Sequence, residues 1–255
     1  MTTTRLRCLV MLLSLVASAG SAAGGTAAPK DPGSAQWPDW DTDWDLEERV
    51  AEVNDGELRL LPPEAVAGAH AHHTRIDIGR SSLREGWVSL EQCHTHLDPV
   101  PAAEVVFDRE RVRGLRVMSS EGIERAWVEG HTVQLQDVGR RARLCIAAES
   151  RALRYLGQGR YRLQNGPFMR RFLDGYYPMH VVLDIRYPAD VLRFEGSRPA
   201  AGLGLRVRRE PGRLGVEADF EGRLYTCMDF LRVGDTNRAE PAPACPSDAA
   251  PVAVE

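Results

Sequence analysis

Lysine is almost absent from this chain, because Lys30 is the single lysine among the 32 basic residues of a 255-residue sequence. Aromatic residues are also scarce, at 7%, and few are interleaved with the arginines, which is unlike a nucleic-acid-binding surface. We therefore expect no nucleic acid as a partner. The hydrophobic content of 43% and the charged content of 27% are ordinary for a globular protein.

Common catalytic signatures are missing as well. The sequence contains no Gly-x-Ser-x-Gly turn, no His-Glu-x-x-His pair, no phosphate-binding glycine loop and no dinucleotide-binding glycine motif. The paired carboxylates of a glycoside hydrolase stay open, because their separation is spatial and is not visible in a sequence. The absences favour a protein that is not an enzyme.

Long apolar runs are lacking except near the N-terminus. Arg5 and Arg7 precede an apolar run over residues 9–16, and Ala17-Ser18-Ala19 then provides the small-x-small cleavage site of a secretory signal peptide. The run is shorter than the roughly 20 residues that a membrane-spanning helix needs. We predict that residues 1–19 are a signal peptide, that the protein is periplasmic or secreted, and that no transmembrane segment remains after cleavage.

Acidic residues are concentrated in one short part of the chain. Residues 31–57 contain ten Asp and Glu residues against one basic residue, whereas residues 58–238 contain 28 basic and 23 acidic residues. We interpret residues 20–36 as a flexible linker and residues 37–57 as an acidic arm with a short helix. Three tryptophans either dock this arm onto the cationic remainder of the chain or contact a partner. They are Trp37, Trp40 and Trp44.

From residue 58 onward apolar and polar residues alternate, which is typical of half-buried strands. Many short alternating runs with turn residues between them predict a mainly β fold. We expect an antiparallel β-sandwich or paired β-units with one or two short helices. Three of the runs predict a meander of consecutive strands, at Leu203–Arg209, Leu214–Phe220 and Arg223–Phe230.

One segment interrupts the alternation. Two phenylalanines four residues apart predict a helix of about two turns over residues 168–175. This helix separates a first β-unit at residues 58–165 from a second β-unit, which lies with the helix in residues 166–236. Residues 237–255 are rich in Pro and Ala and are expected to form a loose tail.

The cysteines are interpreted in the light of export, because disulfides form in oxidising compartments. Cys8 lies within the predicted signal peptide, and the four other cysteines allow three pairings. None belongs to a Cys-x-x-Cys pair, so a thioredoxin-like redox role has no support. Of the three pairings we favour Cys93–Cys145 together with Cys227–Cys245, both structural.

Five of the seven histidines lie between residues 70 and 96. His70/His72 and His94/His96 are spaced two apart, so on strands the members of each pair share one face. Two such pairs on neighbouring strands would converge on zinc or copper, which take imidazole ligands readily. These four residues are our candidate metal site, with Zn or Cu as the cofactor if there is one. The other interpretation is that the histidines face solvent or form local hydrogen bonds.

The same region resembles a known zinc-ligand pattern. His73-x-x-x-Asp77 followed by His94-x-His96 is similar to the His-x-x-x-Asp…His-x-His pattern of the cell-wall endopeptidases that cut peptidoglycan cross-links. The resemblance implies zinc ligands at His73, Asp77 and His96 and a proton shuttle at His94. The two elements are closer in sequence than in that family, and the glycine-rich context is missing, so a zinc-dependent cell-wall hydrolase is our third hypothesis.

Arginines are frequent along residues 140–162. Guanidinium groups bind phosphate, sulfate and carboxylate, so these residues either form a solvated strand face or contact an anionic ligand or partner. The candidates are Arg140, Arg141, Arg143, Arg160 and Arg162, with Arg151 and Arg154 in the same cluster. The sequence thus predicts an exported, non-enzymatic binding or accessory protein of the bacterial cell envelope. Its partner is an unknown envelope protein or an anionic ligand.

Overall fold

The computed structural model describes residues 54–202, 204–235 and 244–246. They form short strands and hairpins, one 3-10 turn and one short helix. The first half contains β1 (Arg59–Leu60), η1 (Pro63–Val66), β2 (His70–Asp77), α2 (Ser82–Glu85), β3 (Val88–Thr95), β4 (Ala102–Val106), β5 (Val112–Glu129) and β6 (Thr132–Ser150). The second half contains β7 (Leu153–Gly157), β8 (Arg160–Phe168), β9 (Arg170–Phe172), β10 (Gly175–Tyr177), β11 (Met179–Arg186), β12 (Leu192–Arg198), β13 (Leu205–Glu210), β14 (Arg213–Glu221) and β15 (Leu224–Arg232).

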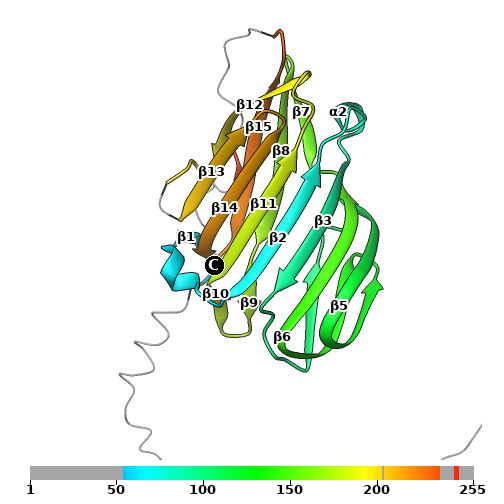
Figure 1. Cartoon of the computed structure of the whole chain (residues 1–255), viewed down its shortest axis with the longest axis vertical. Helices are drawn as coiled ribbons and strands as arrows, with labels where there is room; N and C mark the ends of the chain where they lie inside the picture. Colours follow the sequence, from blue (N-terminus) through cyan, green and yellow to red (C-terminus); the bar gives the residue numbers. More distant parts are fainter. Residues whose placement is uncertain (1–53, 203, 236–243, 247–255) are drawn as a thin grey trace, which may run out of the picture. The chain divides into compact units, whose positions relative to one another are not determined.

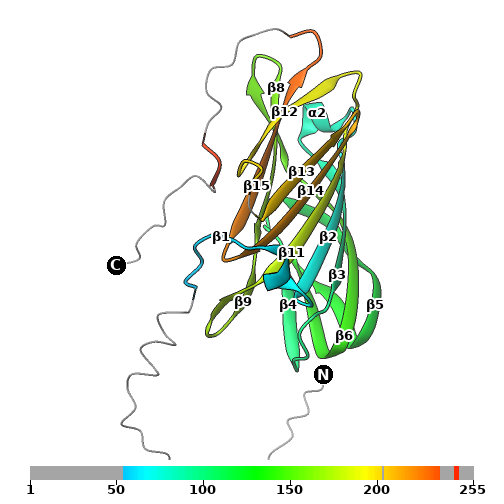
Figure 2. The ribbon, with the colours of Figure 1, turned by 60° about the vertical axis from the view of Figure 1, so that its left-hand side comes forward.

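Two sheets face each other (Figures 1 and 2). The nine-stranded sheet has the order β1-β14-β11-β2-β3-β6-β4, with β13 added at β14 and β5 at β6, and the four-stranded sheet has the order β12-β15-β8-β7. The pairs are antiparallel except for β2 and β11, which run parallel. The predicted mainly β, sandwich-like fold is confirmed.

The main hydrophobic core lies between the two sheets. Leu183 and Ile185 of β11 are fully buried in one cluster with Leu163 of β8 and Phe230 of β15. Along β11 every second residue from Met179 to Ile185 is buried in this core, because successive side chains of a strand point to opposite faces. Burying each such side chain contributes about 1.5–3 kcal/mol, which makes this layer the main source of stability.

A long hairpin extends the large sheet beyond the sandwich. β5 has 18 residues and β6 has 19, and the turn between them carries Gly130 with a φ of 61°. Residues of β6, among them Val133 and Leu144, form a second apolar cluster with β4 and β5. The hairpin is longer than the short alternating runs of the sequence indicated.

The helix predicted over residues 168–175 is wrong. The segment forms β9 and β10, a separate two-stranded hairpin with Phe172 opposite Gly175. The spacing of the phenylalanines has another cause. Phe168 ends β8 and lies edge-on to the His72 ring at 5.2 Å, whereas Phe172 packs at 5.4 Å against Tyr177 on the other strand of the hairpin.

The division into two β-units is also corrected, because their strands share one sheet. β11, from the predicted second unit, pairs along its whole length with β2 of the first. The predicted meander is broken for a similar reason. β13 and β14 pair in the large sheet, but β15 crosses to the small sheet and pairs there with β8 and β12.

Both favoured disulfides are confirmed. Cys93–Cys145 joins the neighbouring strands β3 and β6, and Cys227–Cys245 ties a residue near the C-terminus to β15. Two disulfides fit an oxidising, extracytoplasmic environment. Among the described residues, no helix has the length and apolar character that crossing a bilayer requires.

Several predictions concern residues outside the described ranges. The signal peptide at 1–19, the linker at 20–36 and the three tryptophans of the arm, Trp37, Trp40 and Trp44, all lie there. Of the arm only residues 54–57 are described, and of the tail only residues 244–246.

Candidate functional site

Three of the predicted metal-binding histidines do come together, on the core-facing side of the large sheet. His72 of β2 lies directly opposite His94 of β3, and their rings stack with centroids 4.6 Å apart. The centroid of His70 lies 5.1 Å from that of His94. We call His70, His72 and His94 the histidine cluster. At the cluster, the side chains on the core-facing side of the large sheet change from apolar to polar.

Hydrogen bonds connect the cluster to its neighbours. Gln92 Nε2 donates to His94 Nε2 at 2.6 Å, so His94 Nδ1 carries a proton and donates to His70 Nε2 at 2.9 Å. His72 Nε2 is 2.6 Å from the hydroxyl of Thr74. Each of these ring nitrogens has a partner while all three rings are neutral, which is how buried polar groups avoid an unpaired state.

Burial keeps the cluster neutral. Desolvation, with a further contribution from the nearby Arg170 guanidinium, lowers the pKa of His70 to about 4. Desolvation and the neighbouring His70 lower the pKa of His72 to about 3, and burial holds the pKa of His94 well below its usual range. A proton on any of these rings would be poorly solvated, and protons on two neighbouring rings would repel each other.

The fourth predicted ligand is not part of the cluster. β3 ends at Thr95, and His96 adopts a left-handed φ of 55° and is exposed. Alternation along the strand stops there, so His96 does not share the face of His94. Across the described part of the chain, no three His, Cys, Asp or Glu side chains are arranged so as to hold a metal ion.

The residues of the endopeptidase-like pattern do not share one face of the sheet, because successive side chains of a strand point to opposite faces. His73 is exposed on the opposite face of β2 from the buried His72, and its register partner is Cys93, not His94. The side chains of His73 and His94 therefore lie on different sides of the large sheet. The predicted ligand His73 and the predicted proton shuttle His94 are thus separated by the sheet, and no such ligand set comes together among the described residues.

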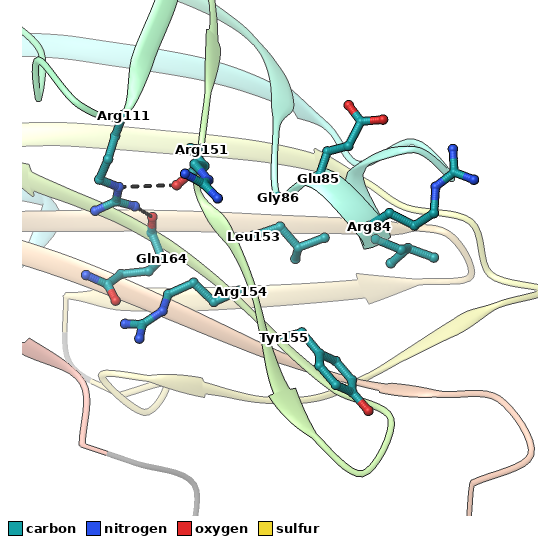
Figure 3. Close-up of a pocket in the computed structure, with 10 residues that line it drawn as sticks. Arg84, Glu85, Gly86, Arg111, Arg151, Leu153, Arg154, Tyr155 and Gln164 are labelled. Carbon is teal, nitrogen blue, oxygen red and sulfur yellow. Dashed lines mark hydrogen bonds between the residues drawn. The ribbon is translucent and has the colours of Figure 1, made fainter.

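A pocket of about 480 Å³ lies at the end of the molecule that carries α2 (Figures 1 and 3). Its wall is built by α2, the segment before β5, the β6–β7 connection, β7 and β8. Gly86 makes the approach of α2 to β7 feasible, because its φ is 79° and a Cβ there would lie 2.7 Å from the Leu153 carbonyl. Four arginines line the pocket, which we call the arginine pocket. They are Arg84, Arg111, Arg151 and Arg154.

The charge of the arginine pocket is largely uncompensated. None of the four guanidinium groups forms an ion pair with a carboxylate of the described residues. Glu85 is the single acidic residue of the lining. Elsewhere on the large sheet, arginines such as Arg213 and Arg206 do pair with carboxylates. The pocket is therefore a local excess of positive charge.

Backbone carbonyls hold one of these guanidinium groups in place. Arg111 Nε donates to the Arg151 carbonyl at 3.2 Å, and its Nη2 donates to the Gln164 carbonyl at 3.1 Å (Figure 3). These acceptors orient the group without neutralising it. Figure 3 shows the side chains of Arg151 and Arg154 on the same side of the pocket as Arg111. A fixed cation with two further arginines beside it suits an anion with several oxygens.

Of the arginines predicted to contact an anion, one is excluded. Arg162 is buried, with 3% side-chain exposure, and is held by Asp229. Arg140, Arg141 and Arg143 are exposed on β6 and do not line the pocket, and Arg160 begins β8 outside it. The arginine pocket is thus lined by two members of the wider cluster, Arg151 and Arg154, and by two residues that the sequence did not single out, Arg84 and Arg111.

Comparison with known proteins does not assign a family. No protein-family model matches the chain, and no curated protein matches it. Two crystal structures of a mutant M1 zinc metallopeptidase from Deinococcus radiodurans, one bound to a Tyr-Ser-Ala substrate, align at 11% identity over 70% of this chain and 43% of theirs, with TM-scores of 0.34 and 0.36. A two-domain M1 zinc metallopeptidase bound to L-tryptophan gives 11% identity, the same 70%, 44% of its own length and a TM-score of 0.34. The chain spans less than half of these proteins, and likeness at this level carries no argument about function.

Proposed function

We propose that this protein is an exported, non-enzymatic binding protein of the bacterial cell envelope whose ligand is anionic. The observation that carries the proposal is the arginine pocket, whose lining includes four arginines that form no ion pair with a carboxylate among the described residues. Such an arrangement attracts anions and excludes cations. Export is supported by the N-terminal sequence and by the two disulfides.

The chemistry of the lining narrows the ligand to a carboxylate, sulfate or phosphate group. Arg111 presents a preoriented guanidinium, and Tyr155, which is 60% exposed, adds an aromatic ring at the rim. Leu153 supplies apolar surface beside these groups. An anionic group attached to a larger, partly apolar body therefore uses more of the lining than a free inorganic ion does.

Replacement of Arg151 and Arg154 by Gln is expected to weaken anion binding about tenfold or more. Each charge-assisted hydrogen bond contributes about 1.5–3 kcal/mol, and 1.4 kcal/mol corresponds to a factor of ten in affinity. Titration calorimetry with inorganic phosphate and with sulfate, at low and at high salt, measures the effect. Affinity should fall as salt rises, because the attraction is screened.

The matched control is Arg140→Gln with Arg141→Gln, which removes the same charge from exposed positions outside the pocket. This variant should bind as the wild type does. Equal weakening in both double variants would mean that net charge and not the pocket attracts the anion. Absence of binding to any of the anions by the folded wild type would refute the proposal.

Metal binding at the histidine cluster is the second candidate. It is supported by the approach of three imidazole rings within 5.1 Å, although their nitrogens already form hydrogen bonds. Mass spectrometry of the protein purified without a histidine tag, beside His94→Ala, decides the matter. About one zinc or copper ion per chain that is lost in His94→Ala would establish the site, and metal-free protein would remove it.

A further inference from the structure

The β9–β10 hairpin carries the most exposed apolar side chain of the described residues. Leu173 lies in its turn and is fully exposed, at 110%, and Met169 just before the hairpin is 41% exposed. Figures 1 and 2 show β9 at the end of the two-layered body opposite α2. Single exposed apolar residues are common on protein surfaces, so the significance of Leu173 depends on what surrounds it.

The base of the hairpin is firmly held. Arg170 makes a two-pronged ion pair with Asp98, at 2.9 and 2.5 Å, and its guanidinium lies 5.6 Å from the Phe172 ring centroid and 5.4 Å from that of Tyr177. These contacts connect the hairpin to the segment after β3. The apolar turn is therefore presented on a fixed support, which lowers the entropic cost of placing it against a partner.

Two arginines flank the aromatic base, and one of them, Arg223, donates through Nε to the Gly56 carbonyl at 3.3 Å. The guanidinium groups of Arg171 and Arg223 lie 5.6 and 5.8 Å from the centroid of the Tyr176 ring. Neither guanidinium has a carboxylate partner among the described residues. From the turn inward, Leu173 is followed by Phe172, and then by the level at which Arg171 lies opposite Tyr176. An aliphatic side chain can enter the acyl region of a bilayer, whereas aromatic rings and arginines are favoured at its interface.

We propose that the β9–β10 hairpin is a membrane-contact element that docks onto an anionic lipid surface. Leu173 enters the boundary of the acyl chains, the rings of Phe172 and Tyr176 lie at the interface, and Arg171 and Arg223 face lipid phosphates. The inference is independent of the anion pocket, which lies at the other end of the body (Figures 1 and 2).

Removal of the Asp174 charge should change vesicle binding in a predictable direction. Its carboxylate, next to Leu173 in the turn, accepts a hydrogen bond from the Tyr177 hydroxyl at 2.6 Å and is exposed. An anionic surface repels this charge, which keeps docking weak and reversible. Asp174→Asn should therefore strengthen binding to anionic vesicles about fivefold, the effect of roughly one charge near such a surface.

The test is co-sedimentation of the purified protein with vesicles of phosphatidylcholine, with and without phosphatidylglycerol. Wild type should bind the vesicles that contain phosphatidylglycerol. Leu173→Ser should bind them about tenfold more weakly, because no aliphatic side chain of this turn is then buried in the bilayer. Val106→Ser is the matched control, since Val106 is 56% exposed on β4. It should bind as the wild type does.

A second comparison separates docking from general charge attraction. Arg140→Gln removes a charge from an exposed position of β6 outside the pocket and should leave vesicle binding unchanged, whereas Arg171→Gln should weaken it. Three outcomes would overturn the proposal: no binding to the anionic vesicles, equal binding by Leu173→Ser and wild type, or weaker binding by Asp174→Asn. The first two would assign the exposed Leu173 to a protein partner or to no partner at all.

Discussion

Arg162→Met is expected to destabilise the fold by about 3–5 kcal/mol, the usual cost of removing one partner of a buried ion pair. Arg162 Nε and Nη2 donate to the two carboxylate oxygens of Asp229 at 2.7 and 3.0 Å, and Nη1 donates to the Ala244 carbonyl at 3.3 Å. Burial on its own would raise the pKa of Asp229, but hydrogen bonds from Arg162 and Arg198 outweigh it and the pKa is lowered. Without Arg162, a largely buried carboxylate loses its main cation. Urea unfolding at pH 7 measures the loss.

Arg113→Met is the control for the loss of one arginine from a strand. Arg113 pairs with Glu149 at 2.8 Å, but both side chains are about half exposed, so this substitution should cost no more than about 1 kcal/mol. A double variant, Arg162→Met with Asp229→Leu, should recover part of the lost stability, because the largely buried carboxylate is removed together with Arg162, although the partly exposed Arg198 then loses its ion pair with Asp229. Similar costs for Arg162→Met and Arg113→Met would contradict the assignment of Arg162 as a structural anchor.

The same arginine shows why the count of arginines in the sequence does not identify a binding site. Arg154 and Arg162 lie opposite each other in the register of β7 and β8, and in the sequence both belong to one basic segment. The strand on the far side of β8 places Asp229 opposite Arg162, whereas β7 is an edge strand and Arg154 is exposed. Which arginine is neutralised depends on a residue 67 positions away.

The mainly β fold and both disulfides could be predicted from the sequence. The fold follows from local residue patterns, and the disulfides follow from the small number of possible cysteine pairings. Alternation of apolar and polar residues records directly which face of a strand is buried, as in Met179–Arg186, where every second residue lies in the core. Four cysteines allow three pairings, and a preference for one pair within the first half of the chain and one pair at the tail sufficed.

The predictions from sequence were wrong where tertiary contacts determine the structure. The phenylalanine spacing of residues 168–172 is equally compatible with one helix and with two strands whose rings serve different neighbours. The crossing of β15 to the other sheet follows a turn at Glu221-Gly222 that looks, in sequence, like an ordinary hairpin turn. The histidine pairs were partly right, since His70, His72 and His94 do meet. His96 failed because the strand ends one residue before it.

Acidification from pH 7 to pH 5 is expected to lower the free energy of unfolding by about 2 kcal/mol through His72 alone. Its pKa is about 3 in the folded protein against 6.5 for the ordinary group, so the unfolded chain binds the proton first as the pH falls. A lowered histidine pKa therefore contributes stability that is present above pH 6.5 and is lost below it. His94, whose pKa is also lowered by burial, adds to the loss. Urea unfolding at pH 7, 6 and 5 measures the slope.

Between pH 7 and pH 5 the change in the free energy of unfolding reports on the histidines. The carboxylates with lowered pKa values, Asp184 and Asp229 among them, lose their contribution to stability only below about pH 4. His73→Gln is the matched control. It removes an exposed imidazole from the opposite face of β2 and should keep the full slope, whereas His72→Gln should flatten it even if the variant is less stable at pH 7. A His72 ring that titrates near pH 6.5 by NMR in the folded protein would contradict the buried, neutral cluster. In that case the acid sensitivity would have to come from groups other than these rings.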